Sequence, residues 1–289
     1  MKRFCVITNR DKEDSNRKAV YIQEYLEQKG GKCLILENRR VISEGVLHYT
    51  EADKIPEETE CVLVLGGDGT MIQAAIDLVH SKLPILGINM GTVGFLTEVE
   101  PQNLERALDL MLQDKYTIEN RIMLRESSVT PTGTSSGKAC YALNDVVLSK
   151  RGDCRLITIK VYINDELADI YRADGLIIST PTGSTGYSLS AGGPVVSPSA
   201  SMMIMTPIAP HTMNTRSIIL SGEEAVTVEI GEGRHNTIEK AVASFDGDTQ
   251  ISMVTGDRIV IRKATVRTKI LKLNHLSFVE VLRQKMSNS

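Results

Sequence analysis

The sequence predicts a Rossmann-like α/β domain, then a β-rich, sandwich-like domain, with a C-terminal segment that returns to the first domain. Two observations predict this division. Before about residue 120, short apolar runs alternate with amphipathic helical patterns, the order typical of α/β folds. Beyond it, apolar and polar residues alternate with period two, as in half-buried strands. We expect one domain at 1–120 plus 275–289 and another at 121–274.

The first domain is expected to begin with a strand at residues 4–8. A helix follows Ser15, a candidate N-cap, and ends at Gly30-Gly31. The run at 61–65 is continuously apolar, which is typical of a parallel strand covered on both faces. Further strands are expected at 33–37 and 84–89, and further helices at 70–80 and 101–114.

The second domain is expected to consist mainly of strands. Asn164-Asp165 indicates a turn between two of them, and the polar residues 131–138 suggest a hairpin tip. Residues 275–286 have a helical pattern and are expected to pack on the first domain. The period-two strands are expected at 157–163, 226–230, 258–262 and 266–273.

Composition excludes several classes of protein. The 289 residues carry 33 basic and 36 acidic side chains, so the chain lacks the basic excess of a nonspecific nucleic-acid or membrane-surface binder. The five cysteines form no Cys-x-x-Cys pair, which favours reduced thiols and a cytoplasmic location. No apolar run approaches the length of a membrane span. We expect no nucleic-acid partner and no membrane partner.

A glycine-rich turn at residues 66–70 follows the apolar run at 61–65. Its three glycines let backbone N–H groups approach phosphate oxygens, while Asp68 projects between them. An ordinary strand-to-helix turn with Asp68 as a helix cap fits the same residues. The turn lacks the lysine of a P-loop and the spacing of a dinucleotide fingerprint. A phosphate site here would need Mg²⁺ or another divalent ion brought in with a nucleotide.

Other polar groups lie beside apolar strands. Asn144-Asp145 interrupts an aliphatic run, so the pair marks either a bulge or a ligand for ribose hydroxyls. Asp174 precedes another apolar run, and the loop at 91–96 is expected beside the 66–70 turn. Asp246 fits a hairpin turn best. None of the histidines has metal-ligand spacing, and no metal ligand is assigned.

Taken together, these motifs resemble those of bacterial NAD kinases over most of the chain. The first motif is shared with lipid kinases and phosphofructokinase-like enzymes, whereas the second, at 174–194, is much more specific. The motifs are Gly66-Gly67-Asp68-Gly69-Thr70, the 91–96 loop, residues 143–147, residues 174–194 and Phe245-Asp246-Gly247.

The resemblance implies an enzyme that uses ATP and a divalent metal to phosphorylate the 2′-hydroxyl of the adenosine ribose of NAD, giving NADP. It implies Asp68 as general base, Asn144 and Asp145 as ribose ligands, and Asp174 as acceptor for an amino or amide group. A homodimer or homotetramer is also implied. The other implied substrate-binding residues are Gly67, Gly69, Thr70, Phe95, Arg155, Arg172, Thr185, Gly186, Tyr187, Ser188, Ser190 and Asp246.

Three positions depart from the family pattern. Asp145 stands where the family mostly has Glu, Gly186 where Ala is usual, and Met90 where Arg is frequent. Two alternatives stay open from the sequence. One is a lipid or sphingoid kinase with the same first motif, and the other is a catalytically silent NAD(P)-binding sensor.

Overall fold

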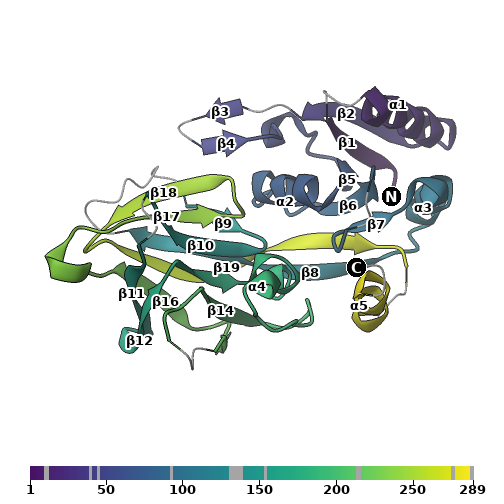
Figure 1. The fold of residues 1–289 in the computed structure, drawn as a ribbon. Coiled ribbons are helices and arrows are strands. Elements are labelled where there is room, and N and C mark those ends of the chain that lie inside the picture. The colour runs from purple at the N-terminus through teal and green to yellow at the C-terminus, as the bar shows by residue number, and fades with distance from the viewer. Residues whose placement is uncertain are drawn as a thin grey trace. The chain divides into compact units, whose positions relative to one another are not determined.

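The computed structural model describes residues 1–9, 13–38, 41–43, 46–91, 94–129, 139–152, 155–212, 216–274 and 277–286. The chain forms two compact units (Figure 1). Unit 1 comprises Met1–Ser43, Leu47–Arg121 and Arg267–Ser289, and unit 2 comprises Glu44–Val46 and Ile122–Val266. The expected return of the C-terminal segment to the first part of the chain is confirmed. The domain boundaries expected at 120 and 275 stay a prediction.

Unit 1 contains a parallel sheet in the order β2-β1-β5-β6, and the end of β19 continues it beside β6. Short β7 also pairs in parallel with β6, and β3 (Val41–Ser43) pairs with β4 (Val46–His48). All residues of β5 and β6 are buried, as expected for doubly covered strands. The bounds are β1 (Arg3–Asn9), β2 (Lys32–Asn38), β5 (Cys61–Gly66), β6 (Pro84–Asn89), β7 (Thr97–Val99) and β19 (Arg258–Lys272).

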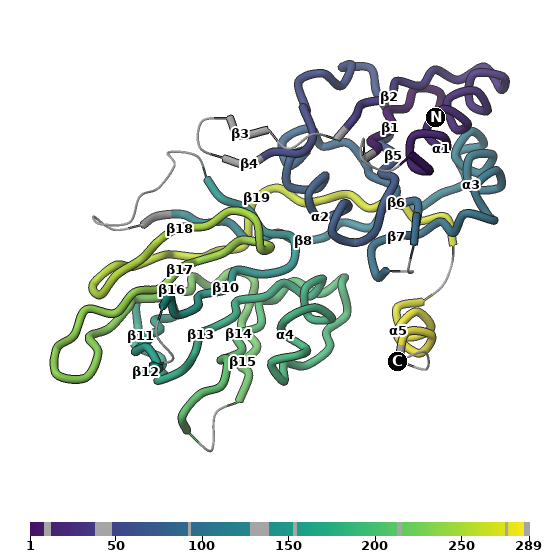
Figure 2. The backbone as a smooth tube through the Cα atoms, turned by 45° about the horizontal axis from the view of Figure 1, so that its top comes forward, coloured from purple at the N-terminus to yellow at the C-terminus, as the bar shows by residue number. Residues whose placement is uncertain are grey.

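Helices cover this sheet, and Figure 2 follows the chain through them. Helix α1 packs against β1 and β2 and buries Ala19, Ile22 and Leu26, which recur at helical spacing. Helix α2 packs against β5 and β6. In the described residues, no helix has both the length and the apolar character needed to span a membrane. The helices are α1 (Glu13–Gln28), α2 (Asp68–Asp77), α3 (Leu104–Leu112) and α5 (Phe278–Met286), with short 3₁₀ turns at Ala52–Lys54 and Pro101–Asn103.

Unit 2 contains antiparallel strands in two sheets. One has the order β12-β11-β16-β19, with β8 and β9 attached, and the other has the order β15-β14-β13-β10-β17-β18. Figure 2 shows β13, β14 and β15 next to one another. A single apolar cluster draws residues from both sheets, including Val161, Ile178 and Phe245. Every second residue of β11 is buried, namely Ile157, Ile159 and Val161. One face of this strand therefore packs into the core.

The remaining bounds complete unit 2. Its strands are β8 (Thr117–Val129), β9 (Tyr141–Ala142), β10 (Asp145–Lys150), β11 (Ile157–Ile163), β12 (Glu166–Ala173), β13 (Gly175–Ser179), β14 (Met202–Ile208), β15 (Ile218–Ser221), β16 (Ala225–Ile230), β17 (Lys240–Phe245) and β18 (Thr249–Val254). Short helical turns lie at Gly183–Thr185, Tyr187–Ser190 and Arg234–Asn236.

Several expected elements differ in detail. Ser15 is not an N-cap, because α1 already begins at Glu13, and Glu13 and Asp14 complement the positive end of the helix. The helix expected from residue 70 begins at Asp68, because Gly67 takes the N-cap position. The two strands expected at 258–262 and 266–273 are one continuous strand, β19. The hairpin tip expected at 131–138 lies outside the described residues.

Glu98 holds the chain at the end of β19. Its carboxylate accepts hydrogen bonds from the backbone N–H groups of Leu273 (3.1 Å) and Asn274 (2.8 Å) and pairs with the ammonium group of Lys272. The Glu98 side chain is 5% exposed, so its carboxylate depends on these donors more than on water.

We expect Glu98→Ala to lower the free energy of unfolding by about 1–3 kcal/mol, because it leaves two backbone donors and one ammonium group unpaired. Thermal unfolding measures the loss, and hydrogen exchange at the Leu273 and Asn274 amides localises it. Glu58→Ala, which removes the same side chain from an exposed position, is the control. Equal melting temperatures for the two variants would contradict this role of Glu98.

Candidate functional site

The glycine-rich turn of unit 1 lies at the carboxyl edge of the parallel sheet. Strand β5 ends at Gly66, which is in register with Asn89 at the end of β6. Helix α2 then begins at Asp68, with Gly67 as N-cap. Two chain segments therefore leave the sheet next to each other. This is the edge at which α/β folds bind ligands, as the sequence predicted for this turn.

The Asp68 carboxylate binds the neighbouring 94–96 loop. Its Oδ2 accepts a hydrogen bond from the backbone N–H of Phe95 (2.7 Å), and its Oδ1 accepts one from that of Leu96 (3.0 Å). Gly94 makes this approach possible, because a Cβ there would lie 1.7 Å from Asp68 Oδ1. The predicted proximity of the two segments is confirmed, and Asp68 is the group that joins them.

Phe95 lies beside a cation that the sequence did not single out. The Nζ of Lys285, on α5, is 5.6 Å from the centroid of the half-buried Phe95 ring. A cation at this distance is attracted to the face of the ring. Lys285 adds a positive charge near the Asp68 turn, and a lysine in a terminal amphipathic helix carries no local signal of such a role.

A second group of predicted residues lines a cavity of about 450 Å³ in unit 2. Asn144, Asp145, Tyr187 and Asp246 all contribute to its wall, together with Gln250. The Tyr187 side chain is exposed, so its aromatic face is accessible. The cavity contains hydrogen-bond acceptors and one aromatic ring, a combination that suits a polar, planar ligand.

Asp246 fixes the backbone of the Asn144-Asp145 pair. It lies in the hairpin turn between β17 and β18, as the sequence predicted, with a φ of 46°. Its carboxylate accepts hydrogen bonds from three successive N–H groups, those of Leu143 (2.6 Å), Asn144 (2.9 Å) and Asp145 (2.9 Å). These residues lie at the break between β9 and β10, where the strand ladder cannot satisfy every donor.

Asp145 and Asp246 bring two carboxyl groups to one buried place. Burial and, to a smaller extent, the charge of Asp246 together raise the pKa of Asp145 to about 7. Burial also raises the pKa of Asp246 to about 6, although the three backbone donors oppose that shift. Asp145 therefore titrates near neutral pH. Its side chain is one methylene shorter than that of the Glu expected at this position, yet it is still buried.

The second glycine-rich segment docks on the same backbone. The Asn144 carbonyl accepts hydrogen bonds from the Thr180 N–H (2.8 Å) and the Ser179 hydroxyl (3.2 Å). A Cβ at Gly183 would lie 2.2 Å from that carbonyl oxygen, so only glycine fits there. Within the described residues, Oδ1 of the Asn144 side chain is buried and has no partner. A buried acceptor of this kind is available to a ligand donor.

The hydroxyl-rich segment serves the fold more than the sequence suggested. Ser188 is fully buried and its hydroxyl bonds Thr206 (3.2 Å). Thr185 Oγ1 bonds the Thr182 carbonyl (3.4 Å). Tyr187 lines the cavity, whereas Ser188 does not. The substrate contacts predicted for Thr185, Gly186, Ser188 and Ser190 stay predictions.

Asp174 has a partner that the sequence did not predict. The Lys150 ammonium lies 2.5 Å from Asp174 Oδ1, and the Lys150 N–H donates to the Asp174 carbonyl (3.0 Å). The ion pair holds the carboxylate in one orientation at the start of β13. Period-two alternation places Lys150 on a strand, but it does not reveal which carboxylate lies across from it.

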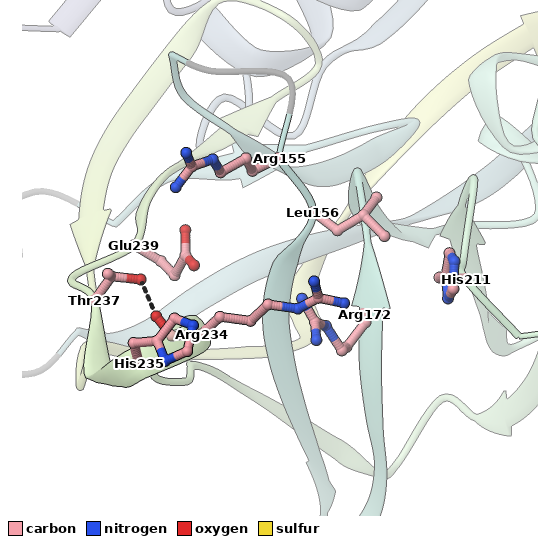
Figure 3. A pocket seen from close by; sticks show the side chains of 8 residues that line it. All are labelled: Arg155, Leu156, Arg172, His211, Arg234, His235, Thr237 and Glu239. Atoms are coloured by element: carbon pink, nitrogen blue, oxygen red, sulfur yellow. Dashed lines mark hydrogen bonds between the residues drawn. The ribbon is translucent and has the colours of Figure 1, made fainter.

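Arg155 and Arg172 lie apart from this cavity. They line a separate one of about 500 Å³, also in unit 2, with a different set of neighbours (Figure 3). In the part of the chain that the structure describes, no group of three or more His, Cys, Asp or Glu side chains is arranged to hold a metal ion.

Comparison with known proteins identifies the family. Family models match both halves of the chain, the ATP-NAD kinase N-terminal domain at residues 5–116 and the ATP-NAD kinase C-terminal domain at 143–273. The chain is 43% identical over 289 residues to the NAD kinase of Lachnoclostridium phytofermentans, covering 100% of both proteins. The chain belongs to the NAD kinase family. It is also 38% identical to the NAD kinase of Moorella thermoacetica, covering 99% of this chain and 89% of that one.

Solved NAD kinase structures share the fold. Yeast NADH kinase, solved with NADH, gives a TM-score of 0.82 at 22% identity and covers 99% of this chain and 88% of that chain. An Archaeoglobus fulgidus NAD kinase, solved with ATP, gives 0.75 at 25% identity and covers 99% of each. The predicted fold class and the resemblance to bacterial NAD kinases are both confirmed, and the chain is an enzyme of this family.

The close approach of Asp68 to Gly94 can be tested in this NAD kinase. We expect Gly94→Ala to displace the Asp68 carboxylate from the Phe95 and Leu96 amides and to lower kcat/KM roughly 10²-fold, the loss typical of a misplaced site. Steady-state kinetics measure it. The control is Gly91→Ala in the same loop, where an added Cβ meets no atom within 4 Å. Unchanged kinetics of Gly94→Ala would show that activity does not depend on the position of the Asp68 carboxylate against the Phe95 and Leu96 amides.

The raised pKa of Asp145 predicts a pH-dependent stability. The folded state holds this proton more tightly than the unfolded chain, whose reference value is 3.8. The resulting stability is present below about pH 4 and is lost as pH rises through about 7. Asp145→Asn, which resembles the protonated form, is therefore expected to raise the melting temperature at pH 8, and the gain should shrink towards pH 4.

The control for this experiment is Asp165→Asn, in the exposed turn between β11 and β12. Its effect on the melting temperature should be the same at both pH values. If Asp145→Asn also gave equal shifts at pH 4 and pH 8, Asp145 would not be a buried carboxyl that titrates near neutrality.

Proposed function

We propose that this enzyme transfers the γ-phosphoryl group of ATP to the 2′-hydroxyl of the adenosine ribose of NAD, giving NADP. Family membership supports the reaction class. The observation that carries the assignment of residues is the Asp68 carboxylate, held at the N-terminus of α2 on a glycine-framed turn. Gly67, Gly69 and Thr70 of the same turn are proposed to approach the phosphates.

Asp68 is proposed as the general base. A ribose hydroxyl is a poor nucleophile near neutral pH, so a carboxylate within hydrogen-bond reach must accept its proton during attack. Each Asp68 oxygen accepts one backbone N–H and keeps a further lone pair for the hydroxyl. The hydrogen bonds from the two backbone N–H groups fix the direction of the carboxylate. This reduces the entropy lost in reaching the reactive geometry.

The cavity in unit 2 is proposed to hold the adenosine end of NAD. Asp145 and the unpartnered Asn144 Oδ1 are suited to accept ribose hydroxyls, and Tyr187 offers a ring for stacking. Asp246 acts chiefly by holding these residues in place. Phe95, Asp174, Arg155 and Arg172 are proposed as further substrate contacts. Residues 1–120 with 275–289 are proposed as the nucleotide-binding domain, and 121–274 as the substrate-binding domain.

A divalent metal such as Mg²⁺ is proposed to arrive with ATP, because the glycine-rich turn carries no lysine that could neutralise the phosphates. When bound, the ion neutralises charge on the transferred phosphoryl group. The protein is proposed to act in the cytoplasm as a homodimer or homotetramer. The match of NAD kinase family models to both halves of the chain argues against the lipid-kinase alternative.

The decisive experiment is to incubate the purified protein with NAD, ATP and Mg²⁺ and to assay NADP. Asp68→Asn is expected to lower turnover by roughly 10²–10⁴-fold, because the amide cannot accept the proton. Its affinity for NAD should stay within about tenfold, because the base acts in the transition state. Failure of the wild type to form NADP would refute the reaction, whereas near-normal turnover of Asp68→Asn would refute only the base.

The structure also shows how to interpret this variant. An asparagine at position 68 keeps one acceptor oxygen but turns an NH₂ group towards the Phe95 or Leu96 N–H, so the loop can shift as well. Gly94→Ala disturbs the same loop and leaves the carboxylate intact. A much larger loss of kcat in Asp68→Asn than in Gly94→Ala would assign the difference to basicity.

A further inference from the structure

The second cavity of unit 2 gathers basic side chains from four places in the chain. Arg155 precedes β11, Arg172 lies on β12, His211 follows β14, and Arg234 with His235 lies between β16 and β17. Figure 3 shows the Arg234 side chain extending from its turn towards Arg172. The cavity has a volume of about 500 Å³, which is enough for a small anionic ligand.

The charge of this cavity is not balanced. Among the residues of its wall that the structure describes, Glu239 is the one acidic side chain, against three guanidinium groups. Among the described residues, none of the three arginines forms an ion pair, and the buried Nε of Arg172 has no hydrogen-bond partner. Guanidinium groups brought together without counter-charges repel one another, so the arrangement favours an anion between them.

Several basic side chains elsewhere in unit 2 pair with carboxylates. Lys150 pairs with Asp174, and Lys160 and Arg258 both pair with Glu229. The cavity differs from these places because it brings three arginines together with no such partner among the described residues. A ligand, rather than the protein itself, is suited to supply the missing negative charge.

The turn that carries Arg234 and His235 is held in one shape. Gly233 N–H donates to the Thr237 carbonyl (2.9 Å), and Thr237 Oγ1 donates to the Arg234 carbonyl (3.0 Å). His235 has a φ of 58°, in the left-handed region. A Cβ at Gly233 would lie 1.9 Å from Glu239 Oε1, so the carboxylate packs directly on this glycine. The backbone of the turn is therefore ordered before any ligand binds.

We propose that this cavity binds a phosphate group with at least two negative charges, and that Arg234 and His235 complete the site with Arg155 and Arg172. Guanidinium groups match phosphate oxygens in paired hydrogen bonds, and the three together offer more donors than a single phosphate can use. The phosphate belongs either to the dinucleotide of the proposed reaction or to a free polyphosphate. Only the first of these sources rests on the proposed function.

This site differs in its residues from the cavity that contains Asp145 and Asp246, since the two share no lining residue. One cavity is rich in acceptors and the other in donors. They are therefore suited to different chemical groups, hydroxyls and amides in the first and phosphates in the second.

The test uses the full chain and inorganic tripolyphosphate as probe, with binding measured by titration calorimetry. The variant Arg234→Gln/His235→Asn removes two of the basic groups, and asparagine tolerates the left-handed backbone at position 235. We expect wild type to bind the probe saturably and the variant to bind it at least about tenfold more weakly, the loss typical of charge-assisted hydrogen bonds. Sodium sulfate at equal ionic strength controls for screening.

Arg262→Gln is the matched variant, because it removes an exposed arginine of the same unit outside the cavity. It should bind the probe like wild type, and all variants should melt like wild type without ligand. Competition by NAD or NADP would identify the dinucleotide as the source of the phosphate, and simultaneous binding would identify a free polyphosphate. Either result supports the site. Absence of saturable binding, or equal affinity in Arg234→Gln/His235→Asn, would overturn it whatever the NADP assay shows.

Discussion

Three successive backbone N–H groups converge on one buried carboxylate, that of Asp246, and the cavity of unit 2 depends on this contact. The carboxylate replaces the strand ladder where β9 gives way to β10, so the break needs no water to satisfy its donors. The same contact places a second carboxyl group, Asp145, next to the first. Asp246 therefore satisfies the backbone at this break and also adds its charge to the burial that raises the pKa of Asp145.

A similar arrangement occurs in unit 1. Asp68 accepts backbone donors from a loop that is 27 and 28 residues away in the sequence, and Gly94 gives it room. In unit 2, Gly183 gives the same kind of room to the Asn144 carbonyl. In each case a polar acceptor joins two segments, and a glycine permits the short distance. Neither glycine has a positive φ, so the backbone conformation does not require glycine at these positions. The lack of space for a Cβ does.

Much of this architecture could be predicted from the sequence, and the exceptions have physical reasons. Continuous apolar runs identified β5 and β6, and period-two alternation identified β11, because burial acts directly on residue type at those positions. The turn at Asp68 was predictable from its glycines. Partners across the fold were not predictable: nothing near Lys150 indicates Asp174, and nothing near Arg234 indicates Arg172. Hydroxyls such as that of Ser188 are ambiguous in the sequence, because a side chain that can bind a ligand can equally bind its own fold.

Strand β19 has a consequence for the order in which the protein can fold as it leaves the ribosome. The strand pairs with β16 through Arg258–Arg262 and with β6 through Lys269 and Ile270, so one strand has a neighbour from unit 2 at its start and one from unit 1 at its end. Residues 1–121 emerge first, yet the edge of β6 at Pro84 and Ile85 stays open until almost the whole chain has been made. An open edge strand can pair with other chains. Translation of the final segment therefore protects the nascent α/β unit from intermolecular pairing at that edge.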